Sequence, residues 1–259
     1  MKTLFLLTCI SLANCFYIEN GISKKDKIVN GEDIDIKHAP YQVSLLRLRS
    51  PFCGGTIIAK SWVVTAGHCI KSHLGVVTEK STLSVRTATS SLLATGTRHQ
   101  IEEVIIHPEY NHKNYDNDIV LIKLRQPLEF NAEQGSIPLA QPDDVPYPGQ
   151  IMQITGFGKV GEHYGYSKTL KLALVPVVSF DNCARVYESI DPITDNMFCA
   201  GDGKADACQG DSGGPAVINN KLAGVVSSGI GCASGFYPGI YTRVDKYYDW
   251  IMQTTNYLS

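Results

Sequence analysis

Short apolar runs broken by turn residues recur along the whole chain. The runs are rich in Val, Ile, Leu and Tyr, and clusters of Gly, Pro, Asn, Asp and Ser separate them. This spacing is typical of β-strands, and little of the chain shows a helical period. The expected strands span residues 41–48, 56–59, 63–65, 82–86, 104–107 and 119–124 in the first half, and 150–156, 171–178, 197–200, 216–218, 221–227 and 239–243 in the second. The pattern predicts an all-β fold made of barrels.

The C-terminal end departs from this pattern, and we expect a helix over about 245–257. Tyr247, Trp250 and Ile251 share one helical face, and Asp245 is a suitable N-cap. A Pro- and Asp-rich stretch at 138–149 divides the strands into two groups. An N-terminal barrel over about 28–140 and a C-terminal barrel over about 141–244 follow.

Residues 1–15 have the features of a secretory signal peptide. Lys2 precedes a short apolar run that ends in small residues, and the run is too short to span a membrane. No other stretch is apolar for long enough to cross a membrane, so we expect a secreted, extracellular protein. The polar stretch 16–27 is either a linker or a propeptide that is cut after Lys27.

Length and charge narrow the class of protein. A chain of 259 residues with 44% hydrophobic content can build either one two-lobed unit or two small domains. The formal net charge of −2 gives no electrostatic footprint for nucleic acid, so we expect no nucleic-acid partner.

Six of the eight cysteines remain if the signal peptide is cut after Cys15. In an oxidising compartment these six predict three disulfides, although about 15 connectivities are possible from sequence. A zinc site is not favoured, because no histidine lies at ligand spacing from a cysteine pair.

The stretch from Asp206 to Pro215 carries the candidate chemistry, because Ser212 stands there between an acid and a Gly-Gly-Pro turn. A serine hydroxyl needs a base to take its proton and a third group to orient that base. The candidates are His68, at the end of the run Trp-Val-Val-Thr-Ala-Gly, and Asp118, just before an apolar strand. Taken singly, each is more often structural: a histidine beside a cysteine, or a cap before a strand.

Together, these three motifs resemble the secreted serine proteases of the chymotrypsin fold. The resemblance covers nearly all of the chain from Ile28 onward and is closest to arthropod trypsins, including digestive trypsins of mites. It implies two six-stranded antiparallel β-barrels with a C-terminal α-helix. It also implies that Ser212 attacks the scissile carbonyl, that His68 shuttles the proton and that Asp118 fixes the histidine tautomer.

The same resemblance implies the substrate-binding residues. Backbone N–H groups of Gly210 and Ser212 would form the oxyanion hole. Asp206 would form the floor of a pocket for Arg or Lys, although it could otherwise be a solvated loop acid. The remaining positions are the pocket walls Gly229 and Gly239, the neighbouring Ala207, the substrate-pairing strand Ser227 and Ser228, and Tyr115 at the second subsite.

Activation and disulfide pairing also follow by resemblance. Cutting after Lys27 by an activating protease would free an ammonium group on Ile28, which would pair with Asp211. The implied disulfides are Cys53–Cys69, Cys183–Cys199 and Cys208–Cys232. The expected partners are protein or peptide substrates and proteinaceous serine protease inhibitors, and we expect a monomer that does not associate with membranes.

Three positions depart from the family. Ser228 and Phe157 each stand where the family usually has Trp, and Gly67 replaces the usual Ala beside His68. Some protease-fold relatives have lost catalysis and act as binding proteins, so a catalytically weakened binding protein is the alternative. No cofactor and no metal are expected, because the loop 90–99 carries no acid for calcium.

Overall fold

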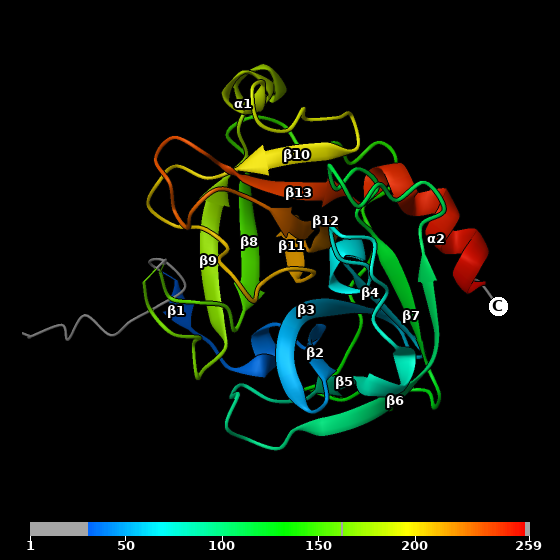
Figure 1. Ribbon diagram of the computed structural model, residues 1–259. Helices are drawn as coiled ribbons and strands as arrows, with labels where there is room; N and C mark the ends of the chain where they lie inside the picture. The colour runs from blue at the N-terminus through cyan, green and yellow to red at the C-terminus, as the bar shows by residue number, and fades with distance from the viewer. Residues whose placement is uncertain (1–30, 162, 257–259) are drawn as a thin grey trace, which may run out of the picture.

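A closed barrel of six antiparallel strands forms the lower part of the molecule in Figure 1. The computed structural model describes residues 31–161 and 163–256, so the predicted signal peptide and propeptide lie outside the described residues. The barrel order is β2-β3-β4-β7-β6-β5, and β2 pairs with β5 to close it. Its strands are β2 (Gln42–Arg47), β3 (Ser50–Ala59), β4 (Trp62–Thr65), β5 (Leu83–Thr87), β6 (Thr97–Ile106) and β7 (Val120–Leu124).

Alternate side chains of these strands fill the barrel, as the period of a strand requires. Ile57, Val64 and Val85 are fully buried. Burying a side chain of this size contributes roughly 1.5–3 kcal/mol, so the apolar runs explain why this half folds. The predicted N-terminal barrel is confirmed, with β3 and β6 longer than their apolar runs.

The second half, together with the N-terminal strand β1, forms a seven-stranded antiparallel sheet, which is a half-closed form of the second barrel that we expected. The order is β1-β9-β8-β11-β12-β13-β10. Its strands are β1 (Glu32–Asp33), β8 (Ile151–Gly156), β9 (Lys171–Pro176), β10 (Met197–Ala200), β11 (Pro215–Ile218), β12 (Lys221–Ser228) and β13 (Gly239–Arg243).

The two edges of this sheet meet only through short contacts. Val177 bridges Ala200, and the Val178 N–H donates to the Cys199 carbonyl at 2.9 Å. Pro176 is the last residue of β9, and it has no N–H for a further ladder bond.

Two α-helices accompany the sheets. The sequence pattern missed α1 (Phe180–Tyr187), which Ser179 caps by accepting a hydrogen bond from the Asn182 N–H. The predicted C-terminal helix is α2 (Tyr248–Thr255), preceded by one 3₁₀ turn. Within the described residues, no helix is both long enough and apolar enough to cross a membrane.

The expected N-cap is wrong. Asp245 does not cap α2, because its carboxylate accepts from Arg243 Nε at 3.1 Å and Nη2 at 2.5 Å. A charge-assisted pair with a guanidinium is a stronger partner than an N–H at a helix start.

One apolar cluster extends from the barrel into the second sheet, which also has a buried cluster of its own. Ile57 of the barrel, Val225 of the second sheet and Ile251 of α2 belong to the same buried cluster. A polar link joins the halves as well, since Thr155 Oγ1 donates to Gln42 Oε1 at 2.7 Å. Segments distant in sequence are thereby held together where the halves meet.

Candidate active site

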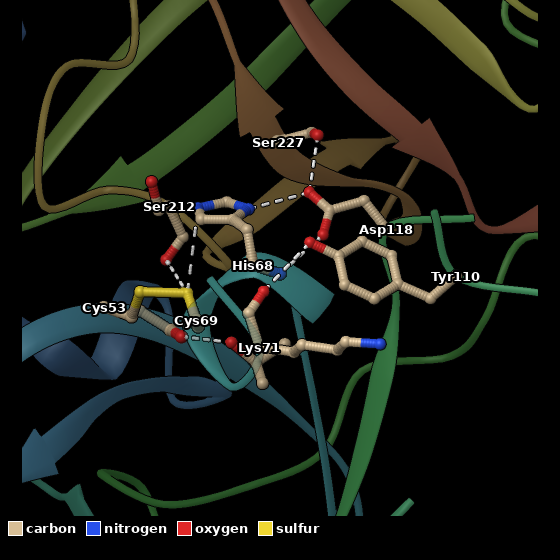
Figure 2. The surroundings of a disulfide bond; sticks show 10 residues. Cys53, His68, Cys69, Lys71, Tyr110, Asp118, Ser212 and Ser227 are labelled. Carbon is tan, nitrogen blue, oxygen red and sulfur yellow. Dashed lines mark hydrogen bonds and ion pairs between the residues drawn. A yellow bond between two sulfur atoms is a disulfide. The ribbon is translucent and has the colours of Figure 1, made fainter. Parts of the chain in front are cut away.

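His68 follows β4, in the 3₁₀ turn Gly67–Cys69. The buried run Trp62–Thr65 anchors this turn in the barrel, and the disulfide Cys53–Cys69 ties it to β3. Figure 2 shows the imidazole beside that disulfide. The candidate base is therefore held by packed and cross-linked backbone.

Asp118 lies two residues before the start of β7, and its side chain is fully buried. Its Oδ2 accepts hydrogen bonds from His68 Nδ1 at 2.8 Å and from Ser227 Oγ at 2.6 Å (Figure 2). Its Oδ1 accepts from the His68 backbone N–H at 2.8 Å. Because a carboxylate faces Nδ1, the proton belongs on Nδ1, and Nε2 is free to accept one.

The pKa of His68 lies above its ordinary value of 6.5. Burial alone would lower this pKa, but the charge of Asp118 and the hydrogen bond to it together outweigh burial. The pair therefore favours the protonated imidazole that a base becomes once it has taken a proton.

Ser212 lies in the loop between Cys208 and β11. The Gly54 N–H of the barrel donates to the Ser212 carbonyl at 2.7 Å, and the Gly213 N–H donates to the Val226 carbonyl at 2.8 Å. Gly213 has a φ of +79°, and a Cβ there would collide with Thr65 Oγ1. Both halves of the molecule thus hold the serine loop, and only glycine fits after Ser212.

The Ser212 side chain lies beside the outer edge of the imidazole, away from Asp118 (Figure 2). Cys69 Sγ is 3.9 Å from His68 Nε2 and 3.7 Å from the Ser212 carbonyl oxygen. In the described part of the chain, no hydrogen bond involves the Ser212 hydroxyl. Such contacts in a free enzyme often tighten only when substrate binds.

Two backbone N–H groups of the same loop are free to donate. The N–H groups of Asp211, Gly213 and Gly214 all donate to carbonyls. Those of Gly210 and Ser212 have no such partner among the described residues. Gly210 has a φ of +98°, a conformation that a side chain would make costly.

Asp211 turns away from the serine into the protein, where it is 2% exposed. Its carboxylate accepts from the Gly158 N–H at 2.7 Å and from the Cys208 N–H at 3.0 Å. Burial raises its pKa to about 6, against the effect of these two hydrogen bonds. A Cβ on Gly158 or Gly156 would collide with this carboxylate, so the room for it depends on glycine.

A slot of about 250 Å³ opens beside His68 and Ser212, and Asp206 lies in its lining. Asp206 is only 5% exposed. Its Oδ2 accepts from the Ala233 N–H at 3.1 Å, but its Oδ1 is buried with no partner among the described residues. Burial raises the pKa of Asp206 to about 7. Asp206 is therefore not a solvated loop acid.

Gly229 and Gly239 form part of the wall of the slot, and neither has a side chain. A Cβ on Gly229 would meet the Gly239 Cα at 3.6 Å, so the two glycines face each other. A Cβ on Gly239 would lie 2.8 Å from Asp206 Oδ1 and would obstruct the approach to that oxygen. The slot is consequently open to a long side chain.

Sequence reasoning missed Tyr241, which also lines the slot. Its hydroxyl is buried without a partner among the described residues, as is Asp206 Oδ1. A signal was available, because Tyr241 stands two residues after Gly239 on β13 and so shares its face.

The other expected substrate residues gather around the same slot. Ala207, Ser227 and Ser228 line it, and β12 ends at Ser228. Tyr115 lies at its mouth, with its ring centroid 5.3 Å from that of His68. Lys27 and Ile28 lie outside the described residues.

Two of the unusual positions have a physical explanation. A Cβ on Gly67 would lie 2.9 Å from the Tyr110 ring and 3.0 Å from Asp118 Oδ1, so glycine here makes room for packing beside the base. Phe157 is buried at the junction of the sheets. It lines a second hollow of about 130 Å³, together with Phe52 and Gly210.

The described residues contain one compact group of His and Cys atoms, namely Cys53, His68 and Cys69. Both sulfurs belong to a disulfide, so they carry no thiolate to bind a metal ion. The other two disulfides are Cys183–Cys199 and Cys208–Cys232, and all three are the pairs implied by the resemblance.

Comparison with known proteins finds similarity over almost the whole described region. The matching family is Trypsin, over residues 28–251. Trypsin 5G1 of Aedes aegypti is 37% identical, covering 91% of this chain and 88% of its own. Trypsin-3 of Salmo salar is 40% identical, covering 88% and 93%. Trypsin II-P29 of Gallus gallus is 39% identical, covering 98% of each chain.

Proposed function

Because the chain belongs to the trypsin family of serine endopeptidases with a chymotrypsin-like fold, we propose that it cuts peptide bonds after Arg or Lys through Ser212, His68 and Asp118. Proteases of this family act on protein substrates and are inhibited by proteinaceous inhibitors. The observation that carries the proposal is the unpaired Asp206 oxygen, buried in the slot that His68 and Ser212 also line.

The chemistry follows from the geometry around Asp118. Ser212 Oγ attacks the scissile carbonyl carbon while His68 Nε2 takes the hydroxyl proton. The N–H groups of Gly210 and Ser212 stabilise the oxyanion of the tetrahedral intermediate, each by roughly 3 kcal/mol. Protonated His68 then gives its proton to the leaving amine, and an acyl-enzyme remains. Water, activated by the same imidazole, releases the second product.

Specificity for Arg and Lys rests on desolvated charge. A guanidinium or ammonium group supplies the partner that Asp206 Oδ1 lacks, and its charge lowers the pKa of the carboxyl back toward the ordinary range. An apolar side chain would leave the buried carboxylate unpaired. The missing Trp at Ser228 leaves the outer part of the slot less enclosed.

We further propose that the protein is a secreted zymogen, activated by a cut after Lys27. Asp211 supports this step, because its buried carboxylate has two N–H partners but no cationic partner among the described residues. The ammonium group of Ile28 would supply the missing charge and lock the serine loop.

The test is hydrolysis of chromogenic peptide amides before and after cutting at Lys27. After the cut we expect turnover of arginyl and lysyl amides but not of a phenylalanyl amide. Before the cut we expect no turnover of any of the three. The matched control is S212A, which keeps the fold and the slot but loses the nucleophile. A folded, correctly cut protein that hydrolyses none of these amides would refute the proposal and support the alternative, a binding protein.

A further inference from the structure

The segment 115–118, which carries Tyr115 and the proposed triad acid Asp118, has an unusual backbone. Tyr115 and Asn117 both have a φ of +55°, in the left-handed region. For a residue with a bulky side chain this conformation is rare and costs free energy, so it persists only where the surroundings hold it. Contacts with the rest of the molecule must therefore maintain this segment.

The second half of the molecule reaches this segment through Asp116. Thr194 Oγ1 donates a hydrogen bond to Asp116 Oδ1 at 2.7 Å, and Asn196 Nδ2 donates to the same oxygen at 3.0 Å. Both donors belong to the stretch between α1 and β10 in Figure 1, and they are 78 and 80 positions away from Asp116 in the sequence. We call Asp116, Thr194 and Asn196 the clasp.

The two donors of the clasp are fixed to the second sheet. The Asn196 N–H donates to Thr194 Oγ1 at 3.3 Å, and the Asn196 carbonyl accepts at 2.9 Å from the N–H of Arg243, the last residue of β13. The next residue, Met197, begins β10 and pairs with Thr242. Strand backbone therefore holds the donors in place.

Asp116 in turn is tied to its own loop by two hydrogen bonds of its backbone. The Asn111 N–H donates to the Asp116 carbonyl at 2.9 Å, and the Asp116 N–H donates to Asn114 Oδ1 at 3.2 Å. Tyr115, between Asn114 and Asp116, takes part in no hydrogen bond within the described part of the chain. Its left-handed backbone therefore depends on the neighbours that the clasp fixes.

The ring of Tyr115 lies beside the catalytic slot. Its centroid is 5.3 Å from that of His68, and the two planes are inclined by 41°. Both residues line the slot that contains Asp206. A substrate whose Arg or Lys enters this slot places its preceding residue against the Tyr115 ring, in the second subsite. The position of the ring therefore limits the size of side chain that this subsite accepts.

The clasp and the triad use separate hydrogen bonds. Within the described residues, the carboxylate of Asp118 accepts from His68 and Ser227, and its carbonyl accepts from Thr242 Oγ1 at 3.0 Å. None of these donors belongs to the clasp. Loss of the clasp should therefore release Tyr115 while Asp118 and His68 keep their geometry.

We propose that the three clasp residues are positioning residues: they hold the Tyr115 ring at the second subsite and thereby set the selectivity for the residue before the scissile Arg or Lys. Thr194 and Asn196 act only through Asp116, because neither of them lines the slot. The inference rests on the proposed endopeptidase function and adds to it a determinant of selectivity outside the cleft. A small side chain fits beside a fixed ring, whereas a bulky one requires the ring to move.

The experiment compares three chromogenic amides on the enzyme cut at Lys27. Two of them carry Ala or Phe before the arginine, and the third is an acetyl-arginyl amide with no preceding residue. We expect the parent to cut the alanyl-arginyl amide with about a tenfold higher kcat/KM than the phenylalanyl-arginyl amide, because a fixed wall discriminates by size. The difference should lie mainly in KM, since the triad is the same for both substrates.

Variants of the clasp should remove this preference. In T194A/N196A both donors are lost, so we expect the preference to fall to about twofold or less, with kcat/KM for the acetyl-arginyl amide changed by less than about twofold. D116A should behave in the same way. D116N should keep the preference, because an amide oxygen can accept from both donors. T194S keeps the hydroxyl and should also retain it.

The matched control is T82A in the first barrel. Thr82 is partly exposed and donates to the Glu79 carbonyl at 2.7 Å, the length of the Thr194 bond to Asp116. T82A should keep the full preference although it loses a comparable hydrogen bond. The Tm of each variant shows whether it is folded at the assay temperature.

The outcomes separate the two proposals. A folded T194A/N196A variant that keeps the preference overturns the clasp, and so does an equal loss on the acetyl-arginyl amide, because the hydrogen bonds would then act on the triad. A parent that cuts none of the amides overturns the endopeptidase function instead. The clasp is then tested by nitration of Tyr115 with tetranitromethane, followed by peptide mass spectrometry. Tyr115 should react several-fold faster in T194A/N196A than in the parent and T82A, and equal rates would overturn the clasp.

Discussion

Asp118 and Asp206 are two of the three buried carboxylates near Ser212, and their surroundings differ in one respect. Both oxygens of Asp118 accept hydrogen bonds, three in all, from His68 and Ser227. Asp206 accepts one backbone N–H on Oδ2, while its Oδ1 has no partner among the described residues.

The contrast shows how one residue type serves two tasks. A carboxylate whose acceptors are all occupied by its own protein is a positioning group, because it has no vacant site for a ligand. A carboxylate buried with a vacant oxygen is a recognition group, because a cation from outside removes its desolvation cost. Changing each carboxylate and its donors separately tests this difference.

The largest effect on kcat is expected at Asp118, whose two oxygens both accept hydrogen bonds. In D118N an amide N–H replaces one acceptor, so His68 would hold its proton on Nε2 and could not take one from Ser212. We expect kcat on an arginyl amide to fall about 10⁴-fold at neutral pH, which is the loss that the same Asp-to-Asn change causes in other serine proteases with this triad. An unchanged Tm would show that the fold survives, and a loss of less than tenfold would contradict the role of Asp118.

The substitution D206S removes the charge that is expected to bind the substrate cation, but it removes none of the catalytic groups. We expect kcat/KM for the arginyl amide to fall on the order of 10³-fold, as for loss of a desolvated ion pair. We also expect the unliganded variant to be more stable at pH 8 than the parent, because a buried unpaired charge is gone. The measurements are steady-state kinetics and urea unfolding; retained arginyl preference would refute the assignment.

The pKa of Asp206 predicts a pH dependence of stability and of ligand binding. Folding raises this pKa from 3.8 to about 7, so the folded form holds the proton more tightly than the unfolded chain. The proton on Asp206 therefore contributes to the free energy of unfolding of the unliganded protein at low pH. This contribution is lost as pH rises from about 4 to about 7. A cationic amidine inhibitor needs the ionised carboxylate, so its affinity should fall about tenfold per pH unit below 7.

Calorimetric titration of the amidine at several pH values, with proton release measured in two buffers, tests that expectation. S212A serves as the control, since it removes turnover but leaves the slot. An affinity that stays constant between pH 5 and pH 8 would mean that Asp206 is ionised throughout.

The smallest effect is expected for S227A, which removes one of three donors to Asp118 and leaves the other two. A hydrogen bond to a charged group contributes roughly 1.5–3 kcal/mol, so stability should fall by about this amount. We expect kcat to fall only about tenfold, and the acid limb of the pH–rate profile to move to higher pH, because the Asp118 charge then acts more strongly on His68. An unchanged acid limb would argue for a merely structural Ser227.

Several elements of the fold followed from the chain pattern. The β-branched run before His68 predicts the buried strand β4, and the apolar run after Asp118 predicts β7. A short continuous apolar run is typical of a strand that is buried on both faces. The greater part of β6, Thr97–Glu103, was missed because its side chains are mostly polar and give little apolar signal. The helix α1 was missed because an eight-residue segment is shorter than the stretch over which a helical period is usually recognised, although its apolar and polar side chains lie on different faces.

The residue types of the site could also be predicted, since a nucleophile, a base and an acid in this chain order are specific for one family. Their burial and their partners could not. Nothing in the sequence around Asp206 shows that one of its oxygens is left without a donor, because the Ala233 N–H that binds the other comes from a loop 27 positions away.

The sequence by itself determined which side chains are available and where most of the strands form. Tertiary structure alone decided that Gly54 would hold the serine loop, that Asp118 would be saturated with donors and that, among the described residues, Asp206 and Arg86 would not find all their partners. The physical reason is that hydrogen-bond satisfaction and desolvation depend on packing between segments distant in sequence, whereas strand formation depends on neighbours along the chain.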